Sequence, residues 1–239
     1  MIKKTFLIIL FLLSVTAFTQ NITDGYLKYS LTLKIDNPAI TELHAQNENK
    51  EDSLITKGVF EAIKSFKNLS FNVELNIYPD TVLIKTADTK ILFIPEKQKK
   101  HTLFYKNNKE YKRFFEVTEG LKKKWNIKHK IEVDRNDKKT INGIEAYKIV
   151  ITEIRQSSLG ELIDVNEVYV NDKIKIPFNN YEILDLNKNI NLTGLILEIK
   201  SYNKDSPSLY NFYELKEYNL KKQDKKLLES IKKRITSTN

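Results

Sequence analysis

Apolar and polar residues alternate along three separate stretches of this chain of 239 residues. In residues 27–35 lysine, serine and threonine separate the apolar positions Leu27, Tyr29, Leu31, Leu33 and Ile35. The alternation recurs at Leu69, Phe71, Val73, Leu75 and Ile77, and again at Trp125, Ile127, His129, Ile131 and Val133. A period of two buries one face of a β-strand and exposes the other. Because parallel strands covered by helices read as unbroken apolar runs, the pattern predicts an antiparallel sheet with one dry face.

Turn residues between the apolar segments predict a meander. Asn142 and Gly143 separate two strand-like segments, and Asn-Gly suits the positive φ angles of a tight hairpin. Residues 87–89 and 107–108 lie between further short apolar segments and are predicted hairpin tips. No linker rich in Pro, Ser or Gly divides the sequence. We therefore predict one domain over residues 20–239, mainly β (α+β), with a curved or half-barrel antiparallel sheet.

Two stretches have helical spacing instead. A helix after the first strand, near residues 52–67, is predicted from Ile55, Val59, Ala62, Ile63 and Phe66. A C-terminal amphipathic helix from about residue 219 is predicted from Leu220, Leu227, Leu228, Ile231 and Ile235, which basic residues surround. Such a basic helix could lie on a membrane surface or dock a partner. The simpler interpretation, which we favour, is a helix packed on the sheet.

The N-terminus predicts export. Lys3 and Lys4 precede an unbroken apolar run over residues 6–13, and small residues at Ala17 and Thr19 fit cleavage before Gln20. We predict a signal peptide over residues 1–19 and a periplasmic or secreted product without a transmembrane segment, since spanning a bilayer takes about 20 apolar residues. The chain has no cysteine, so a disulfide framework and a lipid-modified cysteine are excluded.

Charge does not predict a nucleic-acid partner. The formal net charge is +9. Most of the excess is lysine alternating with apolar residues, as on solvated strand faces, and arginine occurs only at Arg113, Arg135, Arg155 and Arg234. Nucleic-acid sites favour clustered charge and forked arginine contacts. We predict that no nucleic acid is bound.

No motif for catalysis is present in the sequence. The three histidines, His44, His101 and His129, are far apart and lack the spacing of zinc ligands. No serine stands in a Gly-x-Ser-x-Gly elbow, and the six glycines form no phosphate-binding loop. We therefore predict a protein that is not an enzyme and uses no cofactor or metal.

Trp125 and His129 are the candidate ligand-binding residues. Both fall on the predicted apolar face of one strand, two positions on either side of Ile127. They would give an apolar cavity one aromatic wall and one polar group. In the alternative, which we favour, both are core residues and the histidine ring meets a backbone group.

Several segments resemble the GLPGLI family of exported Bacteroidota proteins, whose function is unknown. Residues 191–199 contain Leu192, Thr193, Gly194, Leu195 and Ile196, which resemble the motif that names the family, with threonine in place of its proline. Residues 25–29, 141–148 and 166–170 resemble other family segments in order and spacing. The resemblance implies an exported, antiparallel β-rich protein of the cell envelope.

Gly194 also has a structural interpretation, because glycine at the start of a buried strand allows a close backbone approach. Two function classes stay open. The chain is either a carrier that holds an apolar small molecule against its dry face, or an envelope interaction protein that docks an outer-membrane or secreted partner. An open interior favours the carrier, whereas a filled interior with an exposed apolar patch favours docking.

Overall fold

The computed structural model describes residues 20–21, 24–36, 70–94, 99–106, 109–116, 127–157, 160–176, 194–205, 207–221 and 223–236. Some sequence-based predictions lie outside these ranges. They are the signal peptide over residues 1–19, the helix near residues 52–67, Trp125, and the motif residues Leu192 and Thr193.

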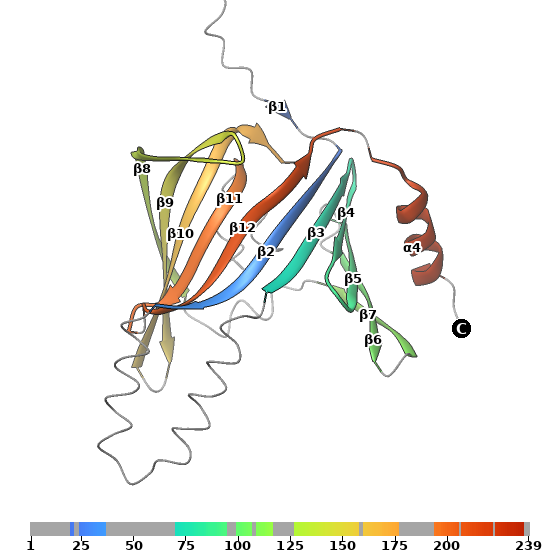
Figure 1. Cartoon of the computed structure of the whole chain (residues 1–239). Coiled ribbons are helices and arrows are strands. Elements are labelled where there is room, and N and C mark those ends of the chain that lie inside the picture. Colours follow the sequence, from blue (N-terminus) through green and yellow to red (C-terminus); the bar gives the residue numbers. More distant parts are fainter. Residues whose placement is uncertain are drawn as a thin grey trace, which may run out of the picture.

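Twelve strands of the described part form one sheet (Figure 1). They are β1 (Gln20–Asn21), β2 (Gly25–Ile35), β3 (Ser70–Tyr78), β4 (Thr81–Lys85), β5 (Thr89–Ile94), β6 (Lys99–Lys106), β7 (Lys109–Glu116), β8 (Ile127–Ile141), β9 (Ile144–Ser157), β10 (Gly160–Lys175), β11 (Gly194–Asn203) and β12 (Leu209–Asn219). Their order is β7-β6-β5-β4-β3-β2-β12-β11-β10-β9-β8, with the short β1 parallel to β10. All other neighbours are antiparallel, which confirms the predicted mainly β, antiparallel fold.

Two meanders meet in the middle of this curved sheet. Strands β2 to β7 follow one another in sequence and in space, as do β8 to β12, and the pairing of β2 with β12 joins the two halves (Figure 1). The predicted hairpin at Asn142 and Gly143 is confirmed, since both have positive φ, 51° and 78°. A backbone hydrogen bond of 2.9 Å from Thr86 N to Thr89 O closes the predicted turn between β4 and β5.

The main core lies on one face of the sheet. Residues directly opposite in antiparallel strands share a face, and Leu27, Leu75 and Ile84 are opposite one another in β2, β3 and β4. Equivalent buried residues continue through the other half at Ile149, Ile151, Val168, Val170, Leu197, Ile199 and Leu215. This inner face is the dry face that the alternation predicted. The buried residues on this face form one continuous apolar cluster.

Three residues predicted on the dry face are exposed. Phe71 is 50% exposed, and Ile131 and Val133 of β8 are 46% and 54% exposed. Phe71 precedes the part of β3 that β4 covers, since that pairing begins at Glu74. Ile131 and Val133 belong to the last strand of the sheet. The prediction of burial was wrong for these residues because an alternating pattern does not reveal where a sheet ends.

A helix, α4 (Lys226–Thr236), packs on the other face of the sheet. Its buried Leu228 and Ile231 join a second apolar cluster with Tyr78, Leu83, Leu92 and Leu103, from β3 to β6. This packing supports the sheet-packed interpretation of the C-terminal helix. Among the described helical residues, none form a segment long and apolar enough to cross a membrane.

The helix starts later than residue 219, where we expected it. Strand β12 continues to Asn219, which lies opposite Tyr26 of β2. The helix then begins at Lys226, whose backbone N donates a 2.9 Å hydrogen bond to Asp224 Oδ1. Aspartate is a favourable residue for such a helix start because its side chain accepts from an otherwise unpaired N–H.

Candidate functional site

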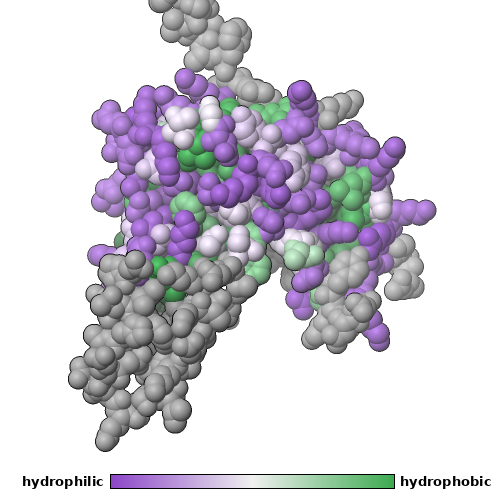
Figure 2. Space-filling model, viewed as in Figure 1, coloured by the Kyte–Doolittle hydropathy of each residue, from purple (hydrophilic) through white to green (hydrophobic). Residues whose placement is uncertain are grey.

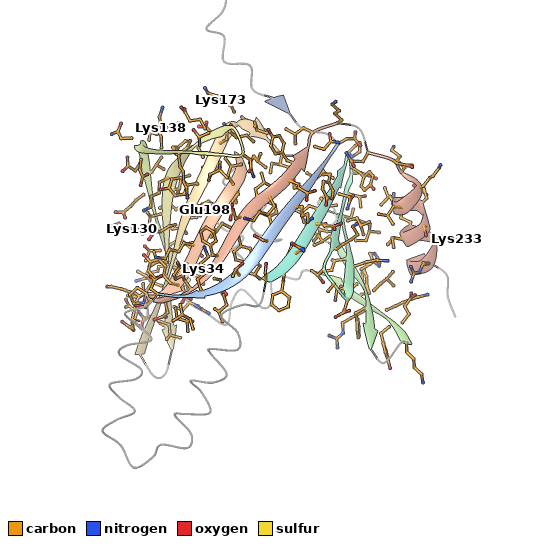
Figure 3. The ribbon with its side chains drawn as sticks, viewed as in Figure 1. Lys34, Lys130, Lys138, Lys173, Glu198 and Lys233 are labelled. Atoms are coloured by element: carbon orange, nitrogen blue, oxygen red, sulfur yellow. The ribbon has the colours of Figure 1, made fainter. Side chains whose placement is uncertain are left out.

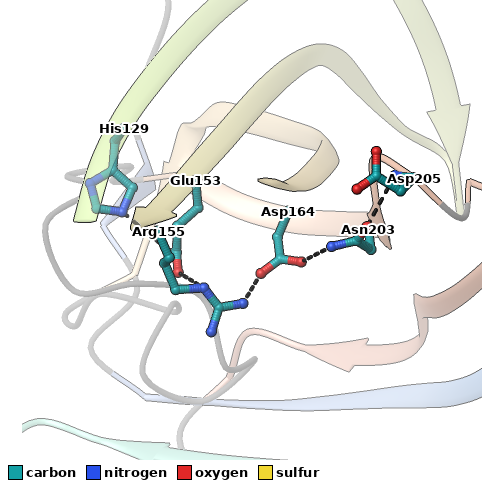
Figure 4. Close-up of polar contacts among 6 residues, drawn as sticks. All are labelled: His129, Glu153, Arg155, Asp164, Asn203 and Asp205. Carbon is teal, nitrogen blue, oxygen red and sulfur yellow. Dashed lines mark hydrogen bonds and ion pairs between the residues drawn. The ribbon is translucent and has the colours of Figure 1, made fainter. Parts of the chain in front are cut away.

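A row of polar side chains crosses the inner face at the β8 end of the sheet. His129 lies opposite Glu153, Glu153 opposite Asp164, and Asp164 opposite Asn203, so the row spans β8, β9, β10 and β11. Opposed residues share a face, and the same face carries Ile131 and the main core. We call His129, Glu153, Arg155, Asp164 and Asn203 the polar row (Figure 4).

The polar row is connected by hydrogen bonds and ion pairs. His129 Nε2 lies 3.4 Å from Glu153 Oε2, and Arg155 Nε lies 3.4 Å from Glu153 Oε1. The Arg155 guanidinium also pairs with Asp164 through Nη2. Asn203 Nδ2 donates to Asp164 Oδ1 over 3.3 Å (Figure 4). One guanidinium thus bridges two carboxylates, and the histidine adds a group that can donate or accept.

The histidine of the candidate pair lies in the polar row. His129 is the only member of the pair that the structure describes, and its side chain is 12% exposed. Its contact in the described part of the chain is the Glu153 carboxylate, whereas the core interpretation expected a backbone group. Among the described residues, no cluster of three His, Asp or Glu side chains forms a metal site. The row offers hydrogen-bonding groups beside an apolar surface.

That apolar surface consists of Ile131 and Val133, which follow His129 at alternate positions along β8. Ile131 lies opposite Ile151 and Val133 opposite Ile149, and both partners in β9 are almost fully buried. The apolar face that is buried in β9 is therefore exposed in the edge strand β8. We call Ile131 and Val133 the edge patch. The sequence placed these residues on the correct face, but only the strand order shows that they are accessible.

The described part of the GLPGLI-like motif is buried. Gly194, Leu195 and Ile196 begin β11, and both Leu195 and Ile196 have no exposed surface. A Cβ atom on Gly194 would lie 2.6 Å from the Asn171 carbonyl oxygen and 2.6 Å from a Val170 methyl carbon. The Tyr29 hydroxyl donates a 2.8 Å hydrogen bond to the Ile196 carbonyl oxygen. These contacts are structural, as the close-approach interpretation of Gly194 predicted.

The tip of the β8–β9 hairpin folds back toward the centre of the sheet. A register shift between Asp134 and Lys138 bends β8, and the rest of the strand turns across its neighbours (Figure 1). Lys139 Nζ then lies 2.5 Å from Glu198 Oε2 in β11. The side-chain amide of Asn142 donates to the Leu215 carbonyl oxygen in β12. The tip is thereby fixed to strands that are not its sequence neighbours.

A second polar network lies on the outer face of the same strands. Lys148 Nζ is 2.7 Å from Glu167 Oε2, and the Tyr202 hydroxyl donates to Glu167 Oε1 over 2.9 Å. Burial favours a raised pKa for Glu167, but the hydrogen bonds from Lys148 and Tyr202 outweigh it and lower the pKa. Burial and the Glu167 carboxylate raise the pKa of Tyr202 to about 12. Glu167 is therefore a charged, fully engaged structural group.

A hollow of about 380 Å³ lies beside the β4–β5 turn, lined by Ser70, Phe71, Asn72, Glu74, Lys85, Thr86, Ala87 and Lys90. Glu74 and Lys85 face each other across β3 and β4 and form a 2.5 Å ion pair within it. Their side chains alternate with those of the buried Leu75 and Ile84, so they point to the outer face. Six of the eight lining residues are polar or charged, and Phe71 and Ala87 supply the apolar part of the lining. The face of the molecule seen in Figure 2 is mostly hydrophilic, with small apolar patches.

No protein-family model and no curated protein matches this chain. The edge patch and polar row are therefore the basis of the functional argument.

Proposed function

We propose that this chain is an exported, non-catalytic binding protein of the cell envelope that docks a partner polypeptide on the edge patch, Ile131 and Val133. Export is inferred from the signal peptide predicted over residues 1–19, and the envelope setting from the resemblance to the GLPGLI family. The exposure of these two side chains at the open end of the sheet carries the proposal.

The tight packing of the main core supports docking over ligand transport. A carrier needs an interior in which most of the surface of its ligand is buried. The main core instead packs Leu27, Tyr29, Ile77, Ile151 and Ile199 with no exposed surface, and the hollow of about 380 Å³ contains the Glu74–Lys85 ion pair. At β8, by contrast, apolar side chains are exposed for a partner to contact.

The chemistry around the edge patch suits a protein partner. Interfaces combine an apolar centre with a polar rim that forms hydrogen bonds. Here the polar row runs beside the patch, with His129 and Glu153 nearest to it in β8 and β9. The basic helix α4 is a weaker candidate for docking, because its apolar residues Leu228 and Ile231 are buried against the sheet.

A photo-crosslinking residue in place of Val133 tests the proposal in cells that export the protein. We expect a discrete adduct with a different polypeptide, and we expect Ile131→Lys in the same chain to abolish it. The control position is Tyr218, a 40% exposed aromatic residue in β12. Equal crosslinking at positions 133 and 218, or insensitivity to Ile131→Lys, would contradict docking at the edge patch.

Native mass spectrometry of the protein from its own envelope tests the carrier alternative. A bound lipid that remains after Val133→Asp would support transport elsewhere in the molecule and count against our proposal. Circular dichroism checks that both variants fold, which we expect because their side chains are about half exposed.

A further inference from the structure

Strand β8 presents an open edge. Within the described residues it pairs only with β9, and it ends the strand order of the sheet. The pairing is uninterrupted from Ile127 to Asp134, where the register shift begins. Every residue from Lys130 to Asn136 is exposed. The outer backbone groups of such a strand are a template for another strand.

The charges on this edge are symmetric about Ile131. Lys128 and Lys130 precede it, and Glu132 and Asp134 follow it at the mirrored positions. In an antiparallel pair centred on Ile131, Lys130 of one copy lies opposite Glu132 of the second copy, and Lys128 lies opposite Asp134. Opposite charges directly across a strand pair stabilise it, whereas like charges destabilise it. The edge is therefore complementary to itself in this register.

The inner-face residues fit the same register. Ile131 of each copy would lie opposite Ile131 of the other, and Val133 opposite His129. The neighbouring registers are less favourable. A pair centred on Lys130 opposes two lysines and keeps two Lys128–Glu132 contacts, and one centred on Glu132 opposes two glutamates and keeps two Lys130–Asp134 contacts. The register centred on Ile131 has four opposite-charge contacts and no like-charge contact, so the charges favour it over its neighbours.

The other open edge, β7, lacks this symmetry. A pair centred on Lys112 opposes two lysines, and one centred on Arg113 opposes two arginines. Centring on Tyr111 places Lys109 opposite Arg113 and Glu110 opposite Lys112, so that like and opposite charges balance. Centring on Phe114 opposes no like charges but gives two Lys112–Glu116 contacts, against four opposite-charge contacts in the β8 register. The charges therefore favour self-pairing at β8 over β7.

We propose that two copies of this chain associate through β8 in the register centred on Ile131, forming one continuous sheet with a two-fold axis. Such an interface is isologous, so both copies contribute the same surface. The two edge patches then become neighbours and form one larger apolar surface between two polar rows. The biological role of the dimer rests on the proposed docking function. The pairing itself rests only on the open edge of β8 and its charges.

Charge reversal tests the pairing in the exported full-length product. Lys130 and Glu132 are 67% and 57% exposed and contact each other over 2.7 Å within one chain (Figure 3 labels Lys130). We expect the unchanged protein to be a dimer in analytical ultracentrifugation. Lys130→Glu and Glu132→Lys should each raise the dimer dissociation constant by about tenfold or more, because each change creates two like-charge contacts across the axis.

Mixing the two single variants is the decisive measurement. Lys130→Glu supplies two acidic positions and Glu132→Lys two basic ones, so an equimolar mixture should form heterodimers with close to the original affinity. The double variant with both changes should also dimerise. The matched control is Lys216→Glu, which breaks a 2.6 Å ion pair with Glu214 on the interior strand β12 and should leave dimerisation unchanged.

A monomeric unchanged protein, or a mixture that stays monomeric, would overturn the pairing. So would an equal loss of dimer in Lys216→Glu. The two proposals can fail separately. If the protein is a stable dimer but no different polypeptide is crosslinked at position 133, the docking proposal is refuted and the dimer is not. If a partner is crosslinked to a monomeric protein, the dimer is refuted and the docking proposal is not.

Discussion

Gly194→Ala is expected to destabilise the protein through steric overlap alone. The new Cβ would lie 2.6 Å from both the Asn171 carbonyl oxygen and a Val170 methyl carbon, and 3.0 Å from the Asn171 carbonyl carbon. Two of the three obstacles are backbone atoms of β10, which cannot move by changing a rotamer. The strands must separate where β11 begins, and overpacking of this kind costs about 1–3 kcal/mol.

One effect opposes that cost and reduces the measured change. Alanine lowers the entropy of the unfolded chain and thereby stabilises by about 0.4–1 kcal/mol. We therefore expect a net loss of about 1–2 kcal/mol for Gly194→Ala and a larger loss for Gly194→Val, whose branched side chain adds further overlap. With a urea dependence of about 2 kcal/mol per molar, Gly194→Ala lowers the unfolding midpoint by about 0.5–1 M.

Gly143 provides a control, because it needs a positive φ angle but not a close contact, whereas Gly194 needs a close contact. It has φ of 78°, but a Cβ there would meet no atom within 4 Å. Asparagine tolerates the left-handed conformation, so Gly143→Asn should cost little, whereas Gly194→Asn should cost at least as much as Gly194→Ala. Unfolding midpoints that are equal for Gly194→Ala and the unchanged protein would refute the close-approach argument.

Two further predictions concern helix packing and alkaline stability. Leu228→Ala should lower the free energy of unfolding by about 2–4 kcal/mol, because Leu228 is buried against the sheet. The control is the same change at its exposed neighbour Leu227. Equal urea midpoints for the two alanine variants would contradict the packing of the helix. Burial raises the pKa of the Tyr29 phenol above its ordinary value of 10.0, so the stability it contributes is complete below about pH 10 and is lost as the pH rises further. Tyr29→Phe should lower the free energy of unfolding by about 1 kcal/mol at pH 7, because the hydrogen bond to the Ile196 carbonyl oxygen is lost. The variant should also lose less stability as the pH rises above about 10. If the free energy of unfolding falls equally steeply with pH in both proteins, the alkaline loss does not come from Tyr29.

Local sequence signals predicted much of the sheet. The alternation in residues 27–35 placed Leu27 and Tyr29 in the core, and Asn142 and Gly143 form the predicted hairpin turn. These predictions succeed because strand period and turn geometry depend on adjacent residues. The pairing of β2 with β12 joins residues far apart in the chain. No local pattern encodes that neighbour.

The candidate site was less predictable for the same reason. His129 was identified, but its contact with Glu153 and the continuation to Asp164 depend on the register of three strands. The exposure of Ile131 and Val133 depends on β8 being the end of the sheet. Of these features, only the charge symmetry around Ile131 is visible in the sequence, and it acquires meaning once the edge is known.

The two ends of the open sheet differ in ways that favour a closed dimer over an extended fibre. At the β7 end, Arg234 of α4 forms an ion pair with Glu110, and the Phe114-centred register of β7 offers two opposite-charge contacts where β8 offers four. At the β8 end, the register shift after Asp134 stops straight pairing, and the hairpin tip beyond it is held by Lys139 at Glu198. Bulges and charges on edge strands limit uncontrolled association. Because β8 is the more complementary edge, two copies pair there first, and this isologous contact uses the β8 edge of both chains, which closes a two-fold assembly.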